Sequence, residues 1–333
     1  MKTLFRQIAA GLLCIMPALA GEPGPAAETP SAKLAFTASG KEYHFDTGVL
    51  RGTLRPEGKS LGLRPVLEGT AGTPIAGPYG LFSLYRMLTA DARFGVAAWD
   101  WASEAKLLAD GAVEVSWAAD KEHPLDMTAV YRWTAPNVLD LKASVKPQQD
   151  LRHFELFLAS YFDGFPACYA YVRGTPHVPP EVAADGATVL PVPSCAGGTP
   201  GFQEAKKEHG HWQTFWRGHD TDAINKIEEI FGDGRWKRPP NPVEWKMMGQ
   251  LAAPLALRRD AKSGLLAVLM SPPEDCFAIS MPFGEEPHRS VYLSLFGRDI
   301  KTGETASARA RLVIGRGITG KQAIELYEAY VKK

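Results

Sequence analysis

Short runs of alternating hydrophobic and polar residues cover most of the chain. In Ala129–Trp133 and Ala308–Leu312, charged and uncharged residues alternate with period two, as a strand with one solvent-facing side requires. Ala109–Gly111 and Lys301–Glu304 have the chemistry of hairpin turns. The pattern predicts strands at Lys33–Thr37, Tyr43–Asp46, Ala112–Trp117, Met127–Trp133, Val138–Val145, Phe154–Phe162, Tyr169–Val172, Leu265–Met270, Phe277–Met281, Val291–Phe296 and Ala306–Ile314.

Only two segments have the spacing of a helix. Asp222–Phe231 places apolar residues on one face and is followed by Gly232, a common helix terminator. Thr319–Val331 opens with Thr319 and Gln322, the spacing of a capping box. Many strands with two helices predict an all-β fold. We expect a large antiparallel β-sandwich with a short internal helix and a C-terminal helix, in a single domain over residues 33–333.

The first twenty residues have the order of a secretory signal. Lys2 and Arg6 precede the apolar run Ile8–Met16, and Ala18–Ala20 supplies the small residues that a signal peptidase accepts. The apolar run is too short to span a bilayer, and no later run reaches about 18 apolar residues. We expect a signal peptide at 1–20, a flexible lead-in at 21–32, no membrane span, and a secreted or periplasmic protein. An amphipathic N-terminal helix is the alternative.

Composition narrows the class of protein. The 37 basic and 37 acidic residues balance, which argues against a nucleic-acid partner. Residues 174–210 form a long Pro/Gly-rich stretch, which indicates either a functional loop or a disordered one. Removal of Cys14 with the signal leaves three cysteines. A Cys168–Cys195 disulfide would close this loop, and three unpaired buried cysteines are the alternative.

The segment Glu208–Asp220 is the richest in chemically active side chains. It contains His209, His211, His219, Trp212, Trp216, Arg217 and Asp220. Tryptophan rings stack on the C–H faces of sugars, while Arg, His and Asp bind hydroxyls or carboxylates. On a strand, His209 and His211 point to one face, so with His219 or Asp220 they are candidate metal ligands. The segment predicts a sugar-binding or catalytic loop, with a structural aromatic cluster or a metal site as alternatives.

Two further aromatic groups are candidates for the same site. Tyr161 and Asp163 share one strand face, so this tyrosine is a candidate general acid, and Tyr169 follows it. The alternative is a core strand that ends in a turn at Asp163. Trp99 and Trp101 face one side of another run, where they either bind sugar or belong to the core.

The runs Gly77–Arg86 and Ser160–Asp163, and the strand pair Ser290–Gly315 with its following helix, resemble the galactose-mutarotase-like β-supersandwich superfamily. That superfamily includes aldose 1-epimerases and the sandwich domains of polysaccharide lyases and glycosidases. The resemblance implies a supersandwich fold and a carbohydrate ligand. Epimerases of this fold commonly have a His before a Ser-Tyr-Phe-Asn string. Here Ala159 stands in the place of that His, and Asp163 in the place of the Asn.

We therefore expect an exported carbohydrate-active protein that acts on a polysaccharide or oligosaccharide, with lyase-type β-elimination of an acidic sugar favoured. In lyases with similar folds a Tyr or His abstracts a proton, and Arg or His neutralises the sugar carboxylate. On residue type and clustering, the catalytic candidates for such chemistry are His211 or His219 as base, Tyr161 as acid and Arg217 on the carboxylate. The substrate-binding candidates are Trp212, Trp216, Asp163, Asp220, Trp99 and Tyr169.

Several alternatives remain open at this stage. A non-catalytic carbohydrate-binding or structural protein fits the same sequence. A glycoside hydrolase would need paired carboxylates, for which Asp163, Asp220 and Glu244 are candidates. An epimerase on the same fold is a further alternative. No cofactor is expected, and a bound divalent metal is left open.

Overall fold

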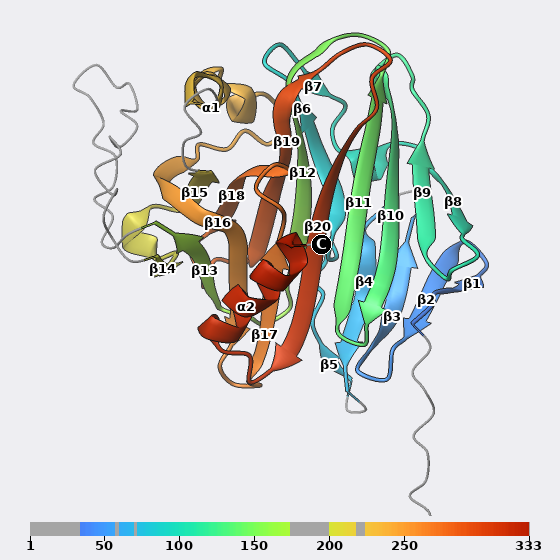
Figure 1. Cartoon of the computed structure of the whole chain (residues 1–333), viewed down its shortest axis with the longest axis vertical. Helices are drawn as coiled ribbons and strands as arrows, with labels where there is room; N and C mark the ends of the chain where they lie inside the picture. The colour runs from blue at the N-terminus through green and yellow to red at the C-terminus, as the bar shows by residue number, and fades with distance from the viewer. Residues whose placement is uncertain (1–33, 57–59, 70–71, 174–199, 218–223, 333) are drawn as a thin grey trace, which may run out of the picture. The chain divides into compact units, whose positions relative to one another are not determined.

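The computed structural model describes residues 34–56, 60–69, 72–173, 200–217 and 224–332, and these residues form two β-sheets (Figure 1). The smaller sheet has five strands in chain order: β1 (Thr37–Ser39), β2 (Glu42–Asp46), β3 (Leu50–Arg55), β4 (Gly62–Glu68) and β5 (Thr73–Pro74). Described helices are few and short, so the all-β sandwich predicted from the sequence is confirmed.

The larger sheet joins strands that lie far apart in the sequence. Its spatial order is β7 (Arg93–Phe94), β6 (Ser83–Leu88), β12 (Leu151–Tyr161), β19 (Ser290–Ile300), β18 (Cys276–Pro282), β15 (Trp212–Arg217), β16 (Lys246–Asp260), β17 (Leu265–Met270), β20 (Ala306–Arg316), β11 (Val138–Pro147), β10 (Leu125–Ala135), β9 (Val113–Trp117) and β8 (Glu104–Leu107). In addition, β13 (Ala167–Val172) pairs with β16 and with β14 (Gly201–Glu204). Among the described strands, β15 and β16 pair in parallel and the other pairs are antiparallel.

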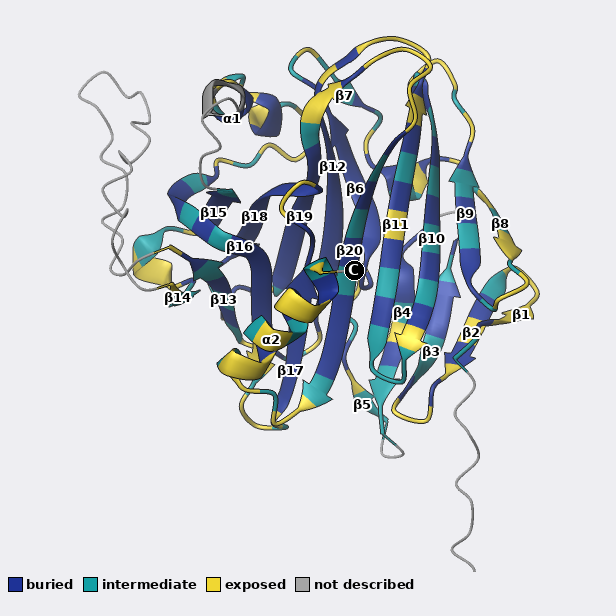
Figure 2. Cartoon of the chain, viewed as in Figure 1, coloured by how far each residue is buried: buried dark blue, intermediate teal, exposed yellow. Residues whose placement is uncertain are grey.

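Buried and exposed side chains alternate along several strands, as the sequence predicts. Along β10, buried residues such as Met127 and Tyr131 alternate with partly exposed ones. The buried Tyr131 hydroxyl donates to the Phe82 carbonyl oxygen at 2.8 Å, so the polar end of this core side chain is satisfied. By contrast, β12, β18 and β19 are buried along most of their length (Figure 2). Both faces of these central strands are therefore covered.

Two helices occur where the sequence predicts them. The first, α1 (Ile224–Gly232), ends at the predicted glycine. The second, α2 (Gly320–Val331), begins with the predicted capping box, in which Thr319 and Gln322 bond each other's backbone. Tyr327 and Tyr330 of α2 are buried together with residues of β16, β17 and β20 (Figure 1). No helix in the described part of the chain is long and apolar enough to cross a membrane.

The structure also adds elements that the sequence analysis did not predict. Nine strands were not anticipated: β3, β4, β5, β6, β7, β8, β14, β15 and β16. The predicted run Lys33–Thr37 meets β1 only at Thr37. Within the predicted irregular stretch, residues 201–204 form β14 and residues 207–209 form a 3-10 helix, η2 (Lys207–His209). The predicted signal peptide, the lead-in and residues 174–199 lie outside the described residues.

Two cysteines lie in the described residues, and both are free and buried. The Cys168 thiol donates to the Pro282 carbonyl oxygen at 3.3 Å. A free Cys168 differs from the favoured Cys168–Cys195 disulfide and matches the alternative of unpaired buried cysteines at this position. Cys195 itself lies outside the described residues.

Candidate functional site

A continuous strip of aromatic rings crosses the face of the large sheet that packs against α1. Neighbouring ring centroids along the strip are 4.3 to 5.8 Å apart. Such ring pairs contribute about 0.5–1.5 kcal/mol each beyond the burial of their area. We call the set the aromatic strip; in spatial order it consists of Tyr85, Trp99, Tyr79, Tyr161, Tyr292, Trp245 and Trp212.

One end of the aromatic strip is a preformed stack. Trp99, in the 3-10 helix η1 (Ala98–Asp100), lies between Tyr85 and Tyr79, with interplanar angles of 6° and 10°. Tyr79 is 44% exposed, whereas Trp99 is partly buried, so the stack ends at solvent. An exposed aromatic ring with an ordered neighbour behind it offers an apolar surface that suits the C–H face of a sugar.

A tight turn places Tyr79 next to Tyr161. The Gly77 N–H donates to the Tyr161 carbonyl oxygen at 2.7 Å, and the Tyr161 N–H donates to the Gly80 carbonyl oxygen at 2.9 Å. Gly80 has a φ of +74°, and a Cβ there would lie 1.8 Å from the Leu61 carbonyl oxygen. A residue larger than glycine does not fit at this position. The Gly-Pro-Tyr-Gly sequence therefore fixes the exposed ring beside the end of β12.

The middle of the aromatic strip contains two buried phenols. Tyr161 and Tyr292 are 4% and 6% exposed, and the Tyr292 hydroxyl donates to the Tyr161 hydroxyl oxygen at 3.1 Å. Burial raises the pKa of Tyr161 well above its ordinary value and raises the pKa of Tyr292 as well. Both phenols are therefore protonated at neutral pH. As a protonated phenol, Tyr161 carries a hydroxyl proton and is unsuited to abstract one from a substrate.

The other end of the aromatic strip meets a carboxylate between two histidines. Glu286 is only 5% exposed in its side chain, whereas His211 and His288 are 55% and 50% exposed. The His288 Nδ1 lies 2.7 Å from Glu286 Oε1, and the His288 N–H donates to Glu286 Oε2 at 2.8 Å. The His211 Nε2 lies 3.7 Å from Glu286 Oε1, which is too long for a hydrogen bond. We call these three residues the Glu286 cluster.

The Glu286 cluster has the arrangement of an oriented base. A carboxylate that accepts from Nδ1–H leaves the Nε2 lone pair of the same ring free to take a proton. His288 has this geometry, and the Trp212 ring lies 5.7 Å from it and 4.8 Å from His211. The structure therefore favours His288 over His211 as the better oriented of the two imidazoles.

Hydrogen bonds from Arg258 stabilise the turn that contains Glu286 and His288. This fully buried guanidinium donates to the carbonyl oxygens of Phe165, Gly284 and Ser290 at 2.8, 3.1 and 3.3 Å. Next to His288, Arg289 is partly buried, and its Nε has no hydrogen-bond partner among the described residues. Arg289 is therefore a partly buried cation of this turn, next in sequence to His288 of the Glu286 cluster.

The structure brings several predicted site residues together. Trp99, Tyr161 and Trp212 all belong to the aromatic strip, and His211 belongs to the Glu286 cluster at its end. These residues come from η1, β12 and β15. The predicted general acid and the predicted sugar-stacking rings therefore share one face of the sheet.

Other predicted residues lie elsewhere. Arg217 ends β15, whereas His211 precedes it, so their Cα atoms are about 20 Å apart at the rise of an extended strand. The Arg217 guanidinium donates to the Pro273 carbonyl oxygen. Trp216 is buried, with its ring 6.0 Å from that of Phe231 in α1. The structure thus does not combine Arg217 with His211 around one sugar ring, and it gives Trp216 a place in the core.

The remaining candidates occupy surface or helix-facing positions. Asp163 is exposed in the turn after β12, where its N–H donates to the Ile75 carbonyl oxygen. Tyr169 packs against the buried cluster that contains Tyr327 of α2. Trp101 is buried in the main core, as one of its two predicted alternatives states. His219 and Asp220 lie outside the described residues.

Metal ligation was one alternative for this region. Within the residue ranges that the structure describes, no three His, Cys, Asp or Glu side chains are grouped as a metal site requires. His209 lies in η2, and its proposed partners His219 and Asp220 are not among the residues described.

Sequence reasoning missed several members of the site, namely Tyr79, Tyr85, Tyr292, Trp245, Glu286 and His288. The spacing of two residues between Glu286 and His288 is a local signal for an acid–histidine contact that could have found His288. No local signal could show that Tyr292 meets Tyr161, because the two residues are 131 positions apart.

Comparison with known proteins gives similarity in structure only. No family model and no curated protein sequence matches the chain. The chain is similar to a galactose 1-epimerase from Lactobacillus acidophilus NCFM, with 11% identity, coverage of 83% of this chain and 95% of that one, and a TM-score of 0.47. It is also similar to an aldose epimerase homologue from C. elegans, with 9% identity, coverage of 81% and 96%, and a TM-score of 0.46.

A mutant heparan sulfate lyase from Pedobacter heparinus is also similar, with 6% identity, coverage of 86% of this chain and 37% of that one, and a TM-score of 0.44. These proteins include epimerases of the superfamily that the sequence pattern resembles. At TM-scores below 0.5 they assign no activity to this chain, whose function must be argued from its own side chains.

Proposed function

We propose that this protein binds a carbohydrate on the aromatic strip and processes it, with β-elimination of an acidic sugar as the favoured reaction. The observation that carries the proposal is the stack of Tyr79 on Trp99, with the hydroxyl pair of Tyr161 and Tyr292 beside it. An apolar ring surface next to hydroxyl donors is the combination that sugar recognition needs.

The reaction requires a base, an acid and a cation. In a β-elimination, a base takes the proton alpha to the sugar carboxylate, a C–O bond breaks, and the leaving oxygen takes a proton. We assign the base to the Glu286 cluster, with His288 or His211 as the group that accepts the proton. Tyr161, which burial keeps protonated by raising its pKa, is the proton donor. Arg289 takes the role that the sequence suggested for Arg217, which is to neutralise the carboxylate.

A non-catalytic binding protein is the second candidate, and one observation favours it. The Tyr161 and Tyr292 hydroxyls are almost fully buried and bonded to each other, so they serve equally well as a structural pair. Export of the protein, based on the N-terminal pattern, is part of the proposal and is tested by cell fractionation of the full chain.

The decisive experiment incubates the purified protein with a panel of neutral and uronic-acid polysaccharides. Ultraviolet absorbance detects the unsaturated sugar that an elimination leaves, and a reducing-end assay detects any cleavage. We expect both signals with a uronic-acid polymer. Reducing ends without absorbance would contradict elimination and indicate hydrolysis. Binding without either signal would support the binding protein, and no binding at all would refute the proposal.

Matched variants assign the roles. Tyr161→Phe removes only the hydroxyl and should abolish turnover while leaving sugar binding unchanged. Tyr292→Phe, which leaves the Tyr161 hydroxyl in place, should retain a large part of the turnover. His288→Ala should remove activity, whereas His44→Ala, at an exposed position of the small sheet, should have no effect. Full activity of both Tyr161→Phe and His288→Ala would refute the assigned roles.

A further inference from the structure

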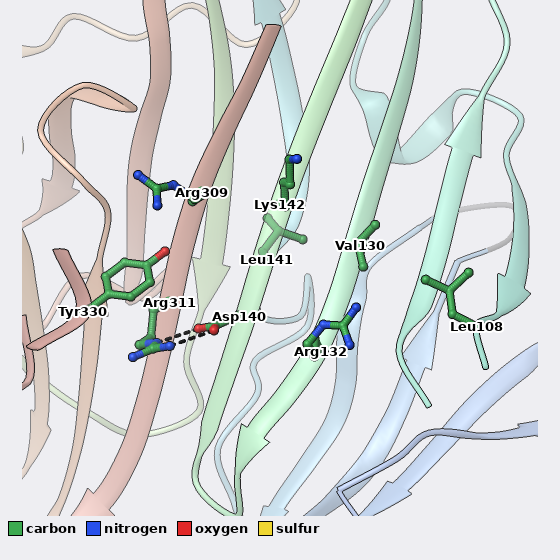
Figure 3. A pocket seen from close by; sticks show the side chains of 9 residues that line it. All are labelled: Leu108, Val130, Arg132, Asp140, Leu141, Lys142, Arg309, Arg311 and Tyr330. Atoms are coloured by element: carbon green, nitrogen blue, oxygen red, sulfur yellow. Dashed lines mark hydrogen bonds and ion pairs between the residues drawn. The ribbon is translucent and has the colours of Figure 1, made fainter. Parts of the chain in front are cut away.

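A groove of about 410 Å³ lies on the outward-facing side chains of β10, β11 and β20, beside the end of α2 (Figure 3). None of its lining residues belongs to the aromatic strip or to the Glu286 cluster. Its lining is strongly cationic. Four cations and a single carboxylate line it, together with an aromatic ring: Arg132, Lys142, Arg309, Arg311, Asp140 and Tyr330.

Most of the carboxylates that neutralise these cations lie outside the lining. Arg132 pairs with Asp110, beyond the edge of the groove. Arg309 bonds Asp275 through its Nε at 3.0 Å and Glu274 through a terminal nitrogen at 2.8 Å. Arg132 and Arg309 are therefore already paired with carboxylates that do not line the groove.

Arg311 is held in one orientation. Its Nε and a terminal nitrogen bond the two oxygens of Asp140 at 2.5 and 2.7 Å, and its guanidinium carbon lies 4.2 Å from the centroid of the Tyr330 ring. A guanidinium that is both bidentate and stacked is preorganised, so its remaining N–H groups are presented without further loss of side-chain entropy.

Lys142 is the feature that points to an anion. It is exposed and has no hydrogen-bond or ion-pair partner among the described residues. In the sheet register it lies directly opposite Arg309 of β20 and opposite Val130 of β10. Like charges directly opposite each other destabilise a sheet. An anion bound between the two cations would offset this repulsion.

We propose that this groove is a second binding site, which takes an oxyanion-bearing ligand: a carboxylated or sulfated saccharide, or a free oxyanion of the same chemistry. Lys142 supplies the uncompensated charge, Arg311 a preorganised donor and Val130 an apolar surface, while the buried Tyr330 ring supports Arg311. The site does not depend on the function proposed for the aromatic strip, and its chemistry is recognition without a reaction.

The test is calorimetric titration of the purified protein at low ionic strength with trigalacturonate, inorganic sulfate and neutral maltotriose. Both anions are expected to bind and maltotriose is not, and binding should weaken as salt is added. If sulfate displaces trigalacturonate, the oxyanion alone suffices. If only trigalacturonate binds and Lys142→Ala abolishes this binding, the ligand of the groove is the acidic saccharide; if Lys142→Ala leaves it unchanged, the sugar binds elsewhere and the proposal is overturned. Equal binding of maltotriose, or no binding of either anion, would overturn the proposal.

Two lysines on one strand face provide the matched comparison. Lys142→Ala should weaken anion binding by about tenfold or more, the loss of a hydrogen bond to a charged group. Lys146→Ala changes another exposed lysine of β11, outside the groove, and should leave binding unchanged. Unchanged affinity of Lys142→Ala, or equal weakening by Lys146→Ala, would refute the site.

Two further variants separate this site from the aromatic strip. Lys142→Glu places opposite charges in register with Arg309, so it should raise the melting temperature of the ligand-free protein while it abolishes anion binding. Trp99→Ala should leave sulfate binding at the groove intact. If Trp99→Ala lost sulfate binding and Lys142→Ala retained it, the anion would bind at the aromatic strip and the inference would be contradicted.

Discussion

The buried ion pair of Glu155 and Arg235 offers the sharpest test of how the aromatic face is covered. Both side chains are fully buried, and the guanidinium lies 3.3 Å from the carboxylate. Arg235 also donates to the His153 carbonyl oxygen at 2.8 Å and to Asp233 at 2.7 Å, while the Trp236 indole N–H donates to Glu155 at 3.1 Å. The pair anchors the 3-10 helix η3 (Arg235–Lys237), whose Trp236 packs in the same buried cluster as Tyr161.

Substitution Arg235→Met should therefore cost about 3–5 kcal/mol at neutral pH, because it leaves the Glu155 carboxylate buried without its cation. Glu155 keeps only uncharged donors such as the Trp236 indole, which repay a small part of its desolvation. Urea denaturation followed by tryptophan fluorescence measures the change in the free energy of unfolding.

The pH dependence of the cost of Arg235→Met tests whether the buried Glu155 charge causes it. Burial raises the pKa of Glu155, and Arg235 opposes that rise. The variant should have a still higher pKa at Glu155. A carboxyl whose folded pKa is raised contributes stability that is present at low pH and is lost as pH rises through the folded pKa. The cost of Arg235→Met should therefore shrink as the solution is acidified.

A double variant completes the test. Glu155→Gln/Arg235→Met removes both charges and should be more stable than the sum of the two single changes predicts, by about 1–3 kcal/mol. A cost below about 1 kcal/mol for Arg235→Met, or single changes that simply add, would refute the argument that an uncompensated buried charge is responsible.

Three further outcomes follow from the structure. Trp99→Ala should weaken sugar binding about tenfold, because it removes the centre of the stack, whereas Val96→Ala, at a neighbouring position that is 51% exposed, should leave binding unchanged. Equal affinities of the two variants in a titration would contradict this. Burial raises the pKa of the Cys276 thiol to about 12 and also raises the pKa of the Cys168 thiol. Peptide mapping should therefore find both cysteines unmodified by iodoacetamide until the protein unfolds, and rapid labelling of the native protein would contradict their burial. Thr319→Ala removes a capping box and should cost about 1 kcal/mol in urea denaturation, whereas Thr319→Ser should cost little; equal costs would exclude capping as the cause.

Part of the candidate site could be predicted from the sequence. Trp99, Tyr161, Trp212 and His211 were selected by residue type and clustering, and the structure places all of them at the aromatic strip or its end. Arg217 was selected on the same grounds but lies at the far end of its strand. Closeness in sequence does not mean closeness in space along an extended strand, where each residue adds about 3.3 Å.

The sequence by itself determined part of the strands, the buried face of alternating ones such as β10 and β20, and where α2 begins, because alternation and capping depend on residues only a few positions apart. It did not determine which strands become neighbours. The pairing of β12 with β19, which brings Tyr292 to Tyr161, and the meeting of Glu286 with His211 were decided by the tertiary structure alone. Side-chain periodicity specifies a face and not a partner, since many registers bury the same residues and only the packing of the whole sheet selects one.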